Sequence, residues 1–299
     1  FTTTFSDASI APGDFVEVEF QFSSPVNLTA VEETAIIIAA GVENQTVLLT
    51  AGYYGPVWHV DTNGDDTTGD GSGGNPFASI QTGIDIAEPG DSVQISPGTY
   101  VENIIISGKN LIVGSLQLWT QDTSYISQTI IDGGGANGTG TVVIFDNNID
   151  TTCVLSGVTI ANGYEVSVQG GPLGFAGGID CIGSNPTLSN LIIRDNYVDG
   201  NGGGIQLSGS NPIIKSVVIQ NNTGLSGGGG ILCTGGSSPF LTNVQIIGND
   251  GGNDGGGLYL TAGSSPTLKD VIIANNTANS GGGLLCWDNN VIPMLDNVT

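Results

Sequence analysis

One segment decides the fold: residues 203–222 read GGIQLSGSNPIIKSVVIQNN, and the same pattern recurs five times between residues 177 and 297. Each copy begins with two glycines and an aliphatic residue. These aliphatic residues follow one another at intervals of 26 or 27 positions: Ile179, Ile205, Ile231, Leu258 and Leu284. A turn proline and a closing asparagine hold fixed places in the pattern, the asparagines being Asn196, Asn222, Asn249 and Asn276. Self-similarity at this period is typical of a solenoid.

Each copy contains three short runs in which apolar residues alternate with others. In one copy these runs are 179–181, 187–188 and 191–193, and Gly, Ser, Asn or Pro stands between them. Period-two runs bounded by turn residues indicate strands. The sequence therefore predicts an all-β parallel β-helix, with coils stacked at about 4.8 Å and like residues in ladders along its axis.

The composition is strongly acidic, with 28 Asp and Glu against four Lys and Arg and a net charge of −24. Such a surface repels nucleic acid and anionic lipid, because phosphate binding needs clustered Lys or Arg. No apolar run approaches the roughly 20 residues of a membrane span. The chain begins at Phe1 without a Met and ends within a repeat, so we expect an interior fragment of a longer polypeptide.

The cysteines are expected to be packing residues. Cys181, Cys233 and Cys286 share one repeat position, two residues after the aliphatic anchor. Two coils separate neighbours, which is about 10 Å and too far for a disulfide. We predict that these three face inward as small hydrophobes, and Cys153 is left unpaired.

Residues 1–55 differ from the repeats. Apolar-rich runs at 15–22, 35–38 and 47–49 predict antiparallel strands. The turn 11–14, the strand after it and residues 50–53 resemble the C-terminal strands of immunoglobulin-like repeats of bacterial surface proteins. The expected domains are a partial immunoglobulin-like β-sandwich module (1–55), an acidic Gly-rich connector (56–76) and the parallel β-helix (77–299).

Three segments carry a more specific resemblance: 59–66 (HVDTNGDD), 75–81 (NPFASIQ) and 88–100 (EPGDSVQISPGTY). They resemble the opening of secreted right-handed β-helix proteins of the pectin-lyase-like superfamily. Phe77, Ile80, Ile84 and Ala87 form an apolar stripe at helical spacing. We predict a helix of about three turns here that caps the open end of the solenoid.

The superfamily includes polysaccharide lyases and hydrolases, adhesins and inert stalks, so the resemblance alone does not give a function. Its enzymes are expected to use Lys or Arg as a base, or aspartates near a His, an Arg and a Lys. Here the one His is His59, and Arg194 precedes Asp195, which predicts a surface ion pair. Lys215 and Lys269 share a repeat position two coils apart, and neither belongs to a familiar motif. Catalysis is therefore not expected from the sequence.

An acidic turn is the best candidate for a metal site. Its residues are Asp61, Asn63, Asp65, Asp66 and Asp70. The first three have the alternate spacing of a calcium loop, but the sixth position is Asp66 instead of Gly and the twelfth is Ser72 instead of Glu. Two alternatives stay open, a Ca²⁺ loop of another geometry and a solvated turn. A second acidic loop spans 249–254, and the closing asparagines are expected to be structural.

The outward ladder Ile192, Val218, Gln245 and Ile272 predicts either aliphatic stacking under a long loop or a contact surface. From these features we expect a secreted or cell-surface bacterial protein with a non-catalytic structural or adhesive role. It would self-associate or present loops to a cell-surface or glycan partner. The alternative is a polysaccharide lyase or hydrolase, or a glycan-binding module, of the pectin-lyase-like superfamily.

Overall fold

A computed structural model describes residues 31–37, 45–51, 56–137, 140–166 and 176–299. The chain divides into two compact units, residues 1–53 and 54–299. In the first unit, β1 (Val31–Ile37) pairs antiparallel with β2 (Gln45–Ala51). The strand expected at 15–22 lies outside the described residues, and the immunoglobulin-like assignment stays a prediction.

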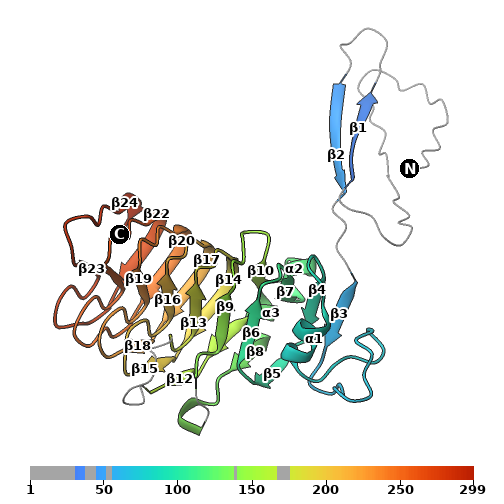
Figure 1. Cartoon of the computed structure of the whole chain (residues 1–299), viewed down its shortest axis with the longest axis horizontal. Helices are drawn as coiled ribbons and strands as arrows, with labels where there is room; N and C mark the ends of the chain where they lie inside the picture. Colours follow the sequence, from blue (N-terminus) through green and yellow to red (C-terminus); the bar gives the residue numbers. More distant parts are fainter. Residues whose placement is uncertain (1–30, 38–44, 52–55, 138–139, 167–175) are drawn as a thin grey trace. The chain divides into compact units, whose positions relative to one another are not determined.

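The second unit is a parallel β-helix, as predicted from the repeat (Figure 1). One long sheet contains β3 (Val57–Val60), β4 (Ser92–Ile95), β7 (Ile112–Ser115), β10 (Val154–Ser156), β14 (Thr187–Arg194), β17 (Ile213–Gln220), β20 (Phe240–Ile247), β22 (Thr267–Ala274) and β24 (Met294–Val298). Its second branch holds β5 (Gly98–Val101), β8 (Thr129–Asp132) and β11 (Thr159–Ala161), which reaches β14.

Two further sheets complete each coil. The second sheet contains β6 (Ile104–Ser107), β9 (Val143–Asp146), β13 (Ile179–Ile182), β16 (Ile205–Ser208), β19 (Ile231–Thr234), β21 (Leu258–Leu260) and β23 (Leu284–Cys286). The third is short and contains β12 (Tyr164–Glu165), β15 (Tyr197–Val198) and β18 (Thr223–Gly224).

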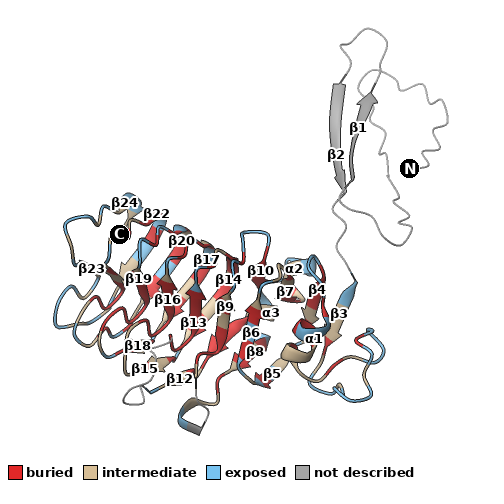
Figure 2. Cartoon of the chain, viewed as in Figure 1, coloured by how far each residue is buried: buried red, intermediate tan, exposed pale blue. Residues whose placement is uncertain are grey.

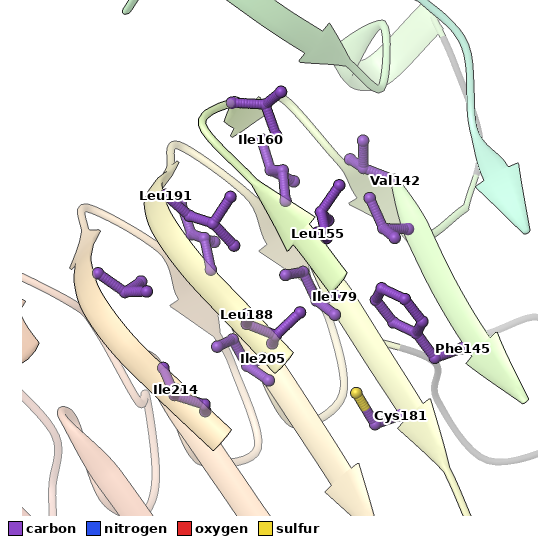
Figure 3. Packing of buried hydrophobic residues seen from close by; sticks show 14 of the residues in the cluster. Val142, Phe145, Leu155, Ile160, Ile179, Cys181, Leu188, Leu191, Ile205 and Ile214 are labelled. Atoms are coloured by element: carbon purple, nitrogen blue, oxygen red, sulfur yellow. The ribbon is translucent and has the colours of Figure 1, made fainter. Parts of the chain in front are cut away.

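The core is a stack of aliphatic ladders, because every second residue of a strand faces the same side. The five anchors pair directly in register from Ile179 to Leu284. The first four are fully buried, and Leu284 packs against the core from the last coil. Figure 2 shows the buried residues running along the strands of the solenoid up to β21 and β22, whereas β23 and β24 of the last coil hold none. Figure 3 shows Leu188, Ile205 and Cys181 pointing into the interior.

A left-handed residue bends each long strand of the repeat. The sequence predicted two strands after each proline, whereas the structure has one strand whose middle residue has φ between 52° and 55°. These residues are Asn190, Ser216, Asn243, Asp270 and Asn297. Asn and Asp tolerate this conformation better than other non-glycine residues, which explains the small polar residue at this position.

The closing asparagines form a buried ladder, as expected. The Asn222 side chain donates to the carbonyl of Ile193 and to Asn249 Oδ1, while its own Oδ1 accepts from the backbone and side-chain nitrogens of Asn196. Asn196, Asn222 and Asn249 are at most 1% exposed. Each side chain therefore satisfies backbone groups of a buried turn, as polar groups in an interior require.

Helices are few and short: α1 (Ile80–Ile86), α2 (Gln117–Thr120), α3 (Ser124–Gln128) and the 3₁₀ turn η1 (Gly135–Asn137). The predicted capping helix is α1, which contacts β3, β4 and β6 and buries its whole apolar stripe. It ends before the predicted three turns because Ala87 is extended and Pro89 follows. The predicted connector contributes β3, which pairs with β4.

The predicted burial of the repeat cysteines is confirmed for Cys181 and Cys233 and is wrong for Cys286. Cys181 and Cys233 lie in one inward column with Leu207 and are fully buried. Cys286 occupies the same column in the last coil but is exposed. Cys153, also buried, and the other three are all free thiols.

Candidate functional site

The carboxylates of the acidic turn bind the backbone of the turn itself. Asp61 accepts from the nitrogen of Asn63, at 2.9 Å, and Asp65 accepts from those of Thr67 and Thr68. Asp66 accepts from Ala78 and Ser79 ahead of α1, and Asp70 from Ser72. Backbone hydrogen bonds lower the pKa of Asp61 and Asp65, and the bonds from Ser72 lower that of Asp70. Burial raises the pKa of Asp66, but its bonds to Ser79 and Ala78 outweigh this effect.

These carboxylates are not gathered around one point. Across the described residues, no group of three or more His, Cys, Asp or Glu side chains could hold a metal ion. The solvated-turn alternative accounts for the hydrogen bonds of all four carboxylates, and calcium binding at this turn stays a prediction.

The cations are dispersed, as the sequence indicated. Arg194 Nη1 lies 2.5 Å from Asp195 Oδ2, so the expected ion pair forms. Lys109 Nζ donates to the carbonyls of Asp85 and Ala87 at the end of α1. Lys215 and Lys269 share one outward column with Thr242 between them. This arrangement offers no cluster of cations on the described surface.

A different group of side chains meets at the short third sheet. The rings of Tyr164 (β12) and Tyr197 (β15) stack with centroids 5.0 Å apart and an interplanar angle of 16°. Glu165 directly follows the first tyrosine, and Asp199 lies two residues after the second. Two aromatic rings and two carboxyl groups therefore lie on neighbouring coils. Tyr164, Tyr197, Glu165 and Asp199 are called the tyrosine–carboxyl site below.

The backbone of the stacked coils fixes this site. The nitrogen of Tyr197 donates to the carbonyl of Gly163 at 2.8 Å, and that of Asp199 donates to the carbonyl of Glu165 at 3.1 Å. Val198, the second residue of β15, is fully buried and anchors the strand in the core. Gly163 also donates to Asn196 Oδ1, so the buried asparagine ladder supports the site.

Burial and nearby charge act on Glu165 and on Tyr197. Burial, followed by the negative charge of Asp199, raises the pKa of Glu165. Burial, Tyr164 and Asp199 likewise raise the pKa of Tyr197, which keeps its hydroxyl a neutral donor. A raised pKa at one of two neighbouring carboxyl groups is a feature of sites for general acid and base catalysis. Glu165 pairs in register with the buried Val198, so its side chain starts on the opposite face of the strand from the stacked rings, whereas Asp199 lies two residues after Tyr197 and shares its face.

The carboxyl group of Glu165 lies near the backbone of Gly140. A Cβ added to Gly140 would lie 3.7 Å from Glu165 Oε2 and 3.2 Å from Asn103 Nδ2, so both side chains approach the same point of the backbone. The nitrogen of Gly140 donates to the carbonyl of Tyr164 at 2.9 Å. Sequence reasoning missed this site because its residues belong to only two coils and do not repeat. The one available signal was the pair of tyrosines, 33 positions apart.

One more carboxyl is unusual but closed to solvent. Asp180 lies on the outward side of β13, yet it is only 1% exposed. Burial raises its pKa to about 7, opposed by the neighbouring Gln206 side chain. Among the described residues no hydrogen bond of standard geometry reaches either carboxyl oxygen. Asp180 is therefore a source of instability, and we assign it no contact with a ligand.

The chain is similar to several solved structures. No protein-family model and no curated protein matches the chain. Among solved structures, pectate lyase Pel9A is similar, with 14% identity over 81% of this chain and 58% of that chain and a TM-score of 0.49. The GH136 lacto-N-biosidase from Eubacterium ramulus has 11% identity over 74% of this chain and 59% of its own, with a TM-score of 0.33. A rhamnogalacturonan lyase has 11% identity over 82% and 88%, with a TM-score of 0.28.

Each of these proteins is a carbohydrate-active enzyme by name, which contradicts the sequence-based expectation that the chain is not an enzyme. That expectation looked for a His, Arg and Lys cluster and gave too little weight to carboxyl pairs. The likeness concerns the fold and assigns neither a substrate nor a catalytic residue. The chain spans less than two thirds of the length of the first two structures. Within the described residues no helix is long and apolar enough to cross a membrane.

Proposed function

We propose that this chain is a carbohydrate-active enzyme that hydrolyses a polysaccharide at the tyrosine–carboxyl site. The observation that supports the proposal is the stack of Tyr164 on Tyr197, on two coils that also carry Glu165, whose pKa burial and the charge of Asp199 raise. Glycoside hydrolysis needs one protonated carboxyl to donate to the leaving oxygen and one ionised carboxyl on the other side of the bond. Stacked aromatic rings offer the apolar surface against which a sugar ring packs.

The two carboxyl groups take different roles. Glu165 is the general acid, because burial and the charge of Asp199 favour its protonated form. Asp199 is the base that activates water, or the nucleophile. The tyrosine rings hold the sugar so that the bond to be cleaved lies between the carboxyl groups, which lowers the entropy cost of reaction. A lyase reaction is less well supported here, since no Lys or Arg of this chain belongs to the site.

The net charge of −24 favours a neutral or cationic polymer over a uronate. An extracellular location on a bacterial surface is part of the proposal, since polysaccharides are found there. The structural and adhesive role expected from the sequence is not carried forward, because it required a chain without catalysis. Glycan binding without cleavage is the second candidate, and the tyrosine stack alone would support it.

The test is a panel of polysaccharides incubated with the full chain, with reducing ends and unsaturated products both measured. We expect new reducing ends, and a loss of at least about 100-fold in rate for Glu165→Gln, the usual range for a general acid. The matched control is Glu88→Gln, the same exchange at an exposed residue before the first coil. Equal rates for the two variants would remove Glu165 from the mechanism. Binding of a glycan that is never cleaved would refute hydrolysis and leave the binding candidate.

A further inference from the structure

A second aromatic pair lies on the same solenoid, further along the axis. Tyr259 on β21 and Trp287, directly after β23, meet edge to face with ring centroids 6.4 Å apart and an angle of 90°. Trp287 is 61% exposed and lies in the last coil of the described residues, whose strands β23 and β24 hold no buried residue. Tyr259 is fixed from below, because a Cβ at Gly227 would lie 2.7 Å from its ring. The pair is thus an ordered aromatic corner with one ring open to solvent.

Carboxylates flank this corner as well. A Cβ at Gly227 would lie 2.7 Å from the Tyr259 ring and 3.0 Å from the carbonyl oxygen of Asp254, and Asp288 directly follows Trp287 in the chain. After burial, the negative charges of Asp254 and Asp288 also raise the pKa of Tyr259. Asp254 is held by a backbone bridge to Ser280 on the next coil. Tyr259, Trp287, Asp254 and Asp288 therefore repeat the composition of the tyrosine–carboxyl site, two aromatic rings with two acids.

The two sites are close along the axis. The column that begins with Tyr164 and Tyr197 continues through Thr223 to Asp250, two coils beyond Tyr197. At about 4.8 Å per coil this is about 10 Å. Asp254 comes four residues after Asp250, Tyr259 lies nine residues after it on the second sheet, and Trp287 lies one coil further along. The axial offset of the two sites is therefore about 10–15 Å, and an oligosaccharide of several sugar units would be needed to reach both.

Both sites combine aromatic rings with carboxyl groups, which are the side chains that bind an organic cation. Ammonium groups bind over aromatic faces and pair with carboxylates. The negative field of a chain with net charge −24 attracts cationic polymers and repels anionic ones. Of its four cations, Arg194 is paired with Asp195 and Lys109 is bound to backbone carbonyls. Neither is available to neutralise this field at the aromatic sites.

We propose that the glycan recognised by this chain carries free amino groups, and that Tyr259, Trp287, Asp254 and Asp288 form a second subsite for one amino sugar. The inference rests on the proposed function and names the substrate class of the same surface. The tyrosine–carboxyl site binds the sugar at the cleaved bond, and the second subsite binds the same polymer further along the axis.

The experiment compares glucosamine oligomers with their fully N-acetylated forms, with binding measured by calorimetry at low and high salt and cleavage measured in parallel. The free-amine form should bind at least about tenfold more tightly at low salt, with the advantage shrinking as salt rises. Trp287→Ala should weaken this binding about 5- to 10-fold, the range of a cation–π contact. Trp119→Ala, at a tryptophan that is 40% exposed on α2, is the matched control and should change nothing.

Equal or tighter binding of the acetylated oligomers would overturn the inference, and so would equal effects of the two tryptophan variants. The proposed function fails separately. Cleavage of a neutral or acetylated glycan alone would leave hydrolysis intact and refute the amino-sugar class. Binding of free-amine oligomers that needs Trp287, with no cleavage of any glycan, would support the subsite and refute the hydrolase.

Discussion

Replacing Asp180 by Asn should stabilise the solenoid, and the gain should depend on pH. Burial raises the pKa of Asp180 from its ordinary 3.8 to about 7. A pKa unit corresponds to about 1.4 kcal/mol, so folding loses up to about 4 kcal/mol once this carboxyl is ionised in the unfolded state. Asp180 is 1% exposed, which leaves little screening by solvent.

Because folding raises the pKa of Asp180, the wild type loses stability as pH rises. Below about pH 3.8 the carboxyl is protonated in both states and costs nothing. As pH rises from there to about 7, the unfolded state releases its proton first, so the stability of the wild type falls. Above about pH 7 the loss is complete and constant. Asp180→Asn should therefore match the wild type near pH 3.5 and exceed it by up to about 4 kcal/mol near pH 8.

Urea unfolding followed by tryptophan fluorescence measures this difference. Trp58, Trp119 and Trp287 are the three tryptophans of the chain and all belong to the unit 54–299, so the signal reports the solenoid. Asp150→Asn is the control, because the hydroxyl and backbone nitrogen of Thr152 lower the pKa of Asp150. Asp150→Asn should have the opposite effect: the variant should be less stable than the wild type at pH values above the lowered pKa of Asp150. Parallel pH profiles for wild type and Asp180→Asn would refute the reasoning.

Three other predictions concern the core and the thiols. Asn222→Ala removes four hydrogen bonds of the buried ladder and should lower the free energy of unfolding by about 2–4 kcal/mol. The control Asn279→Ala removes one exposed bond of 3.4 Å and should lower it by less than about 0.5 kcal/mol. Denaturant titration measures both values, and equal losses would contradict a stabilising role of the ladder. Ile231→Ala, at a fully buried anchor, should lower the free energy of unfolding by about 2–5 kcal/mol. Ile272→Ala, at a residue of the outward ladder that is 44% exposed, should lower it by less than about 1 kcal/mol. A larger loss for Ile272→Ala would mean that the strands face the other way. A thiol reagent should modify Cys286 in the native protein and reach Cys153 and Cys233 only after unfolding. The reason is that burial raises the pKa of Cys153 to about 11 and that of Cys233 to about 12. Mass spectrometry of the labelled peptides measures this, and labelling of Cys153 or Cys233 in the native protein would contradict the prediction.

The repeat made most of the solenoid predictable. A change of one residue in register would turn Ile205 and Leu207 from the core to the surface, so their alternation fixes the facing of β16. The asparagine ladder was also predictable, since a polar residue repeated at every coil must be satisfied by its own copies. The bend at Asn190 was not, because a left-handed residue inside a strand leaves the alternation on either side intact.

Structural features that do not recur in the repeat could not be predicted, because no sequence period marks them. Helices α2 and α3 have four and five residues, too few to show a helical period. The tyrosine–carboxyl site depends on how residues 164 and 197 meet across coils of unequal length, which no local pattern encodes. The raised pKa of Glu165 depends on its burial and on the charge of Asp199, and both require coordinates.

The most direct test of the central claim is hydrolysis in water enriched in ¹⁸O, with products analysed by mass spectrometry. If Glu165 and Asp199 hydrolyse a glycosidic bond, each new reducing end carries one ¹⁸O atom, and Glu165→Gln abolishes its formation. Unsaturated products without ¹⁸O, or undiminished labelling by Glu165→Gln, would contradict the assignment of this site.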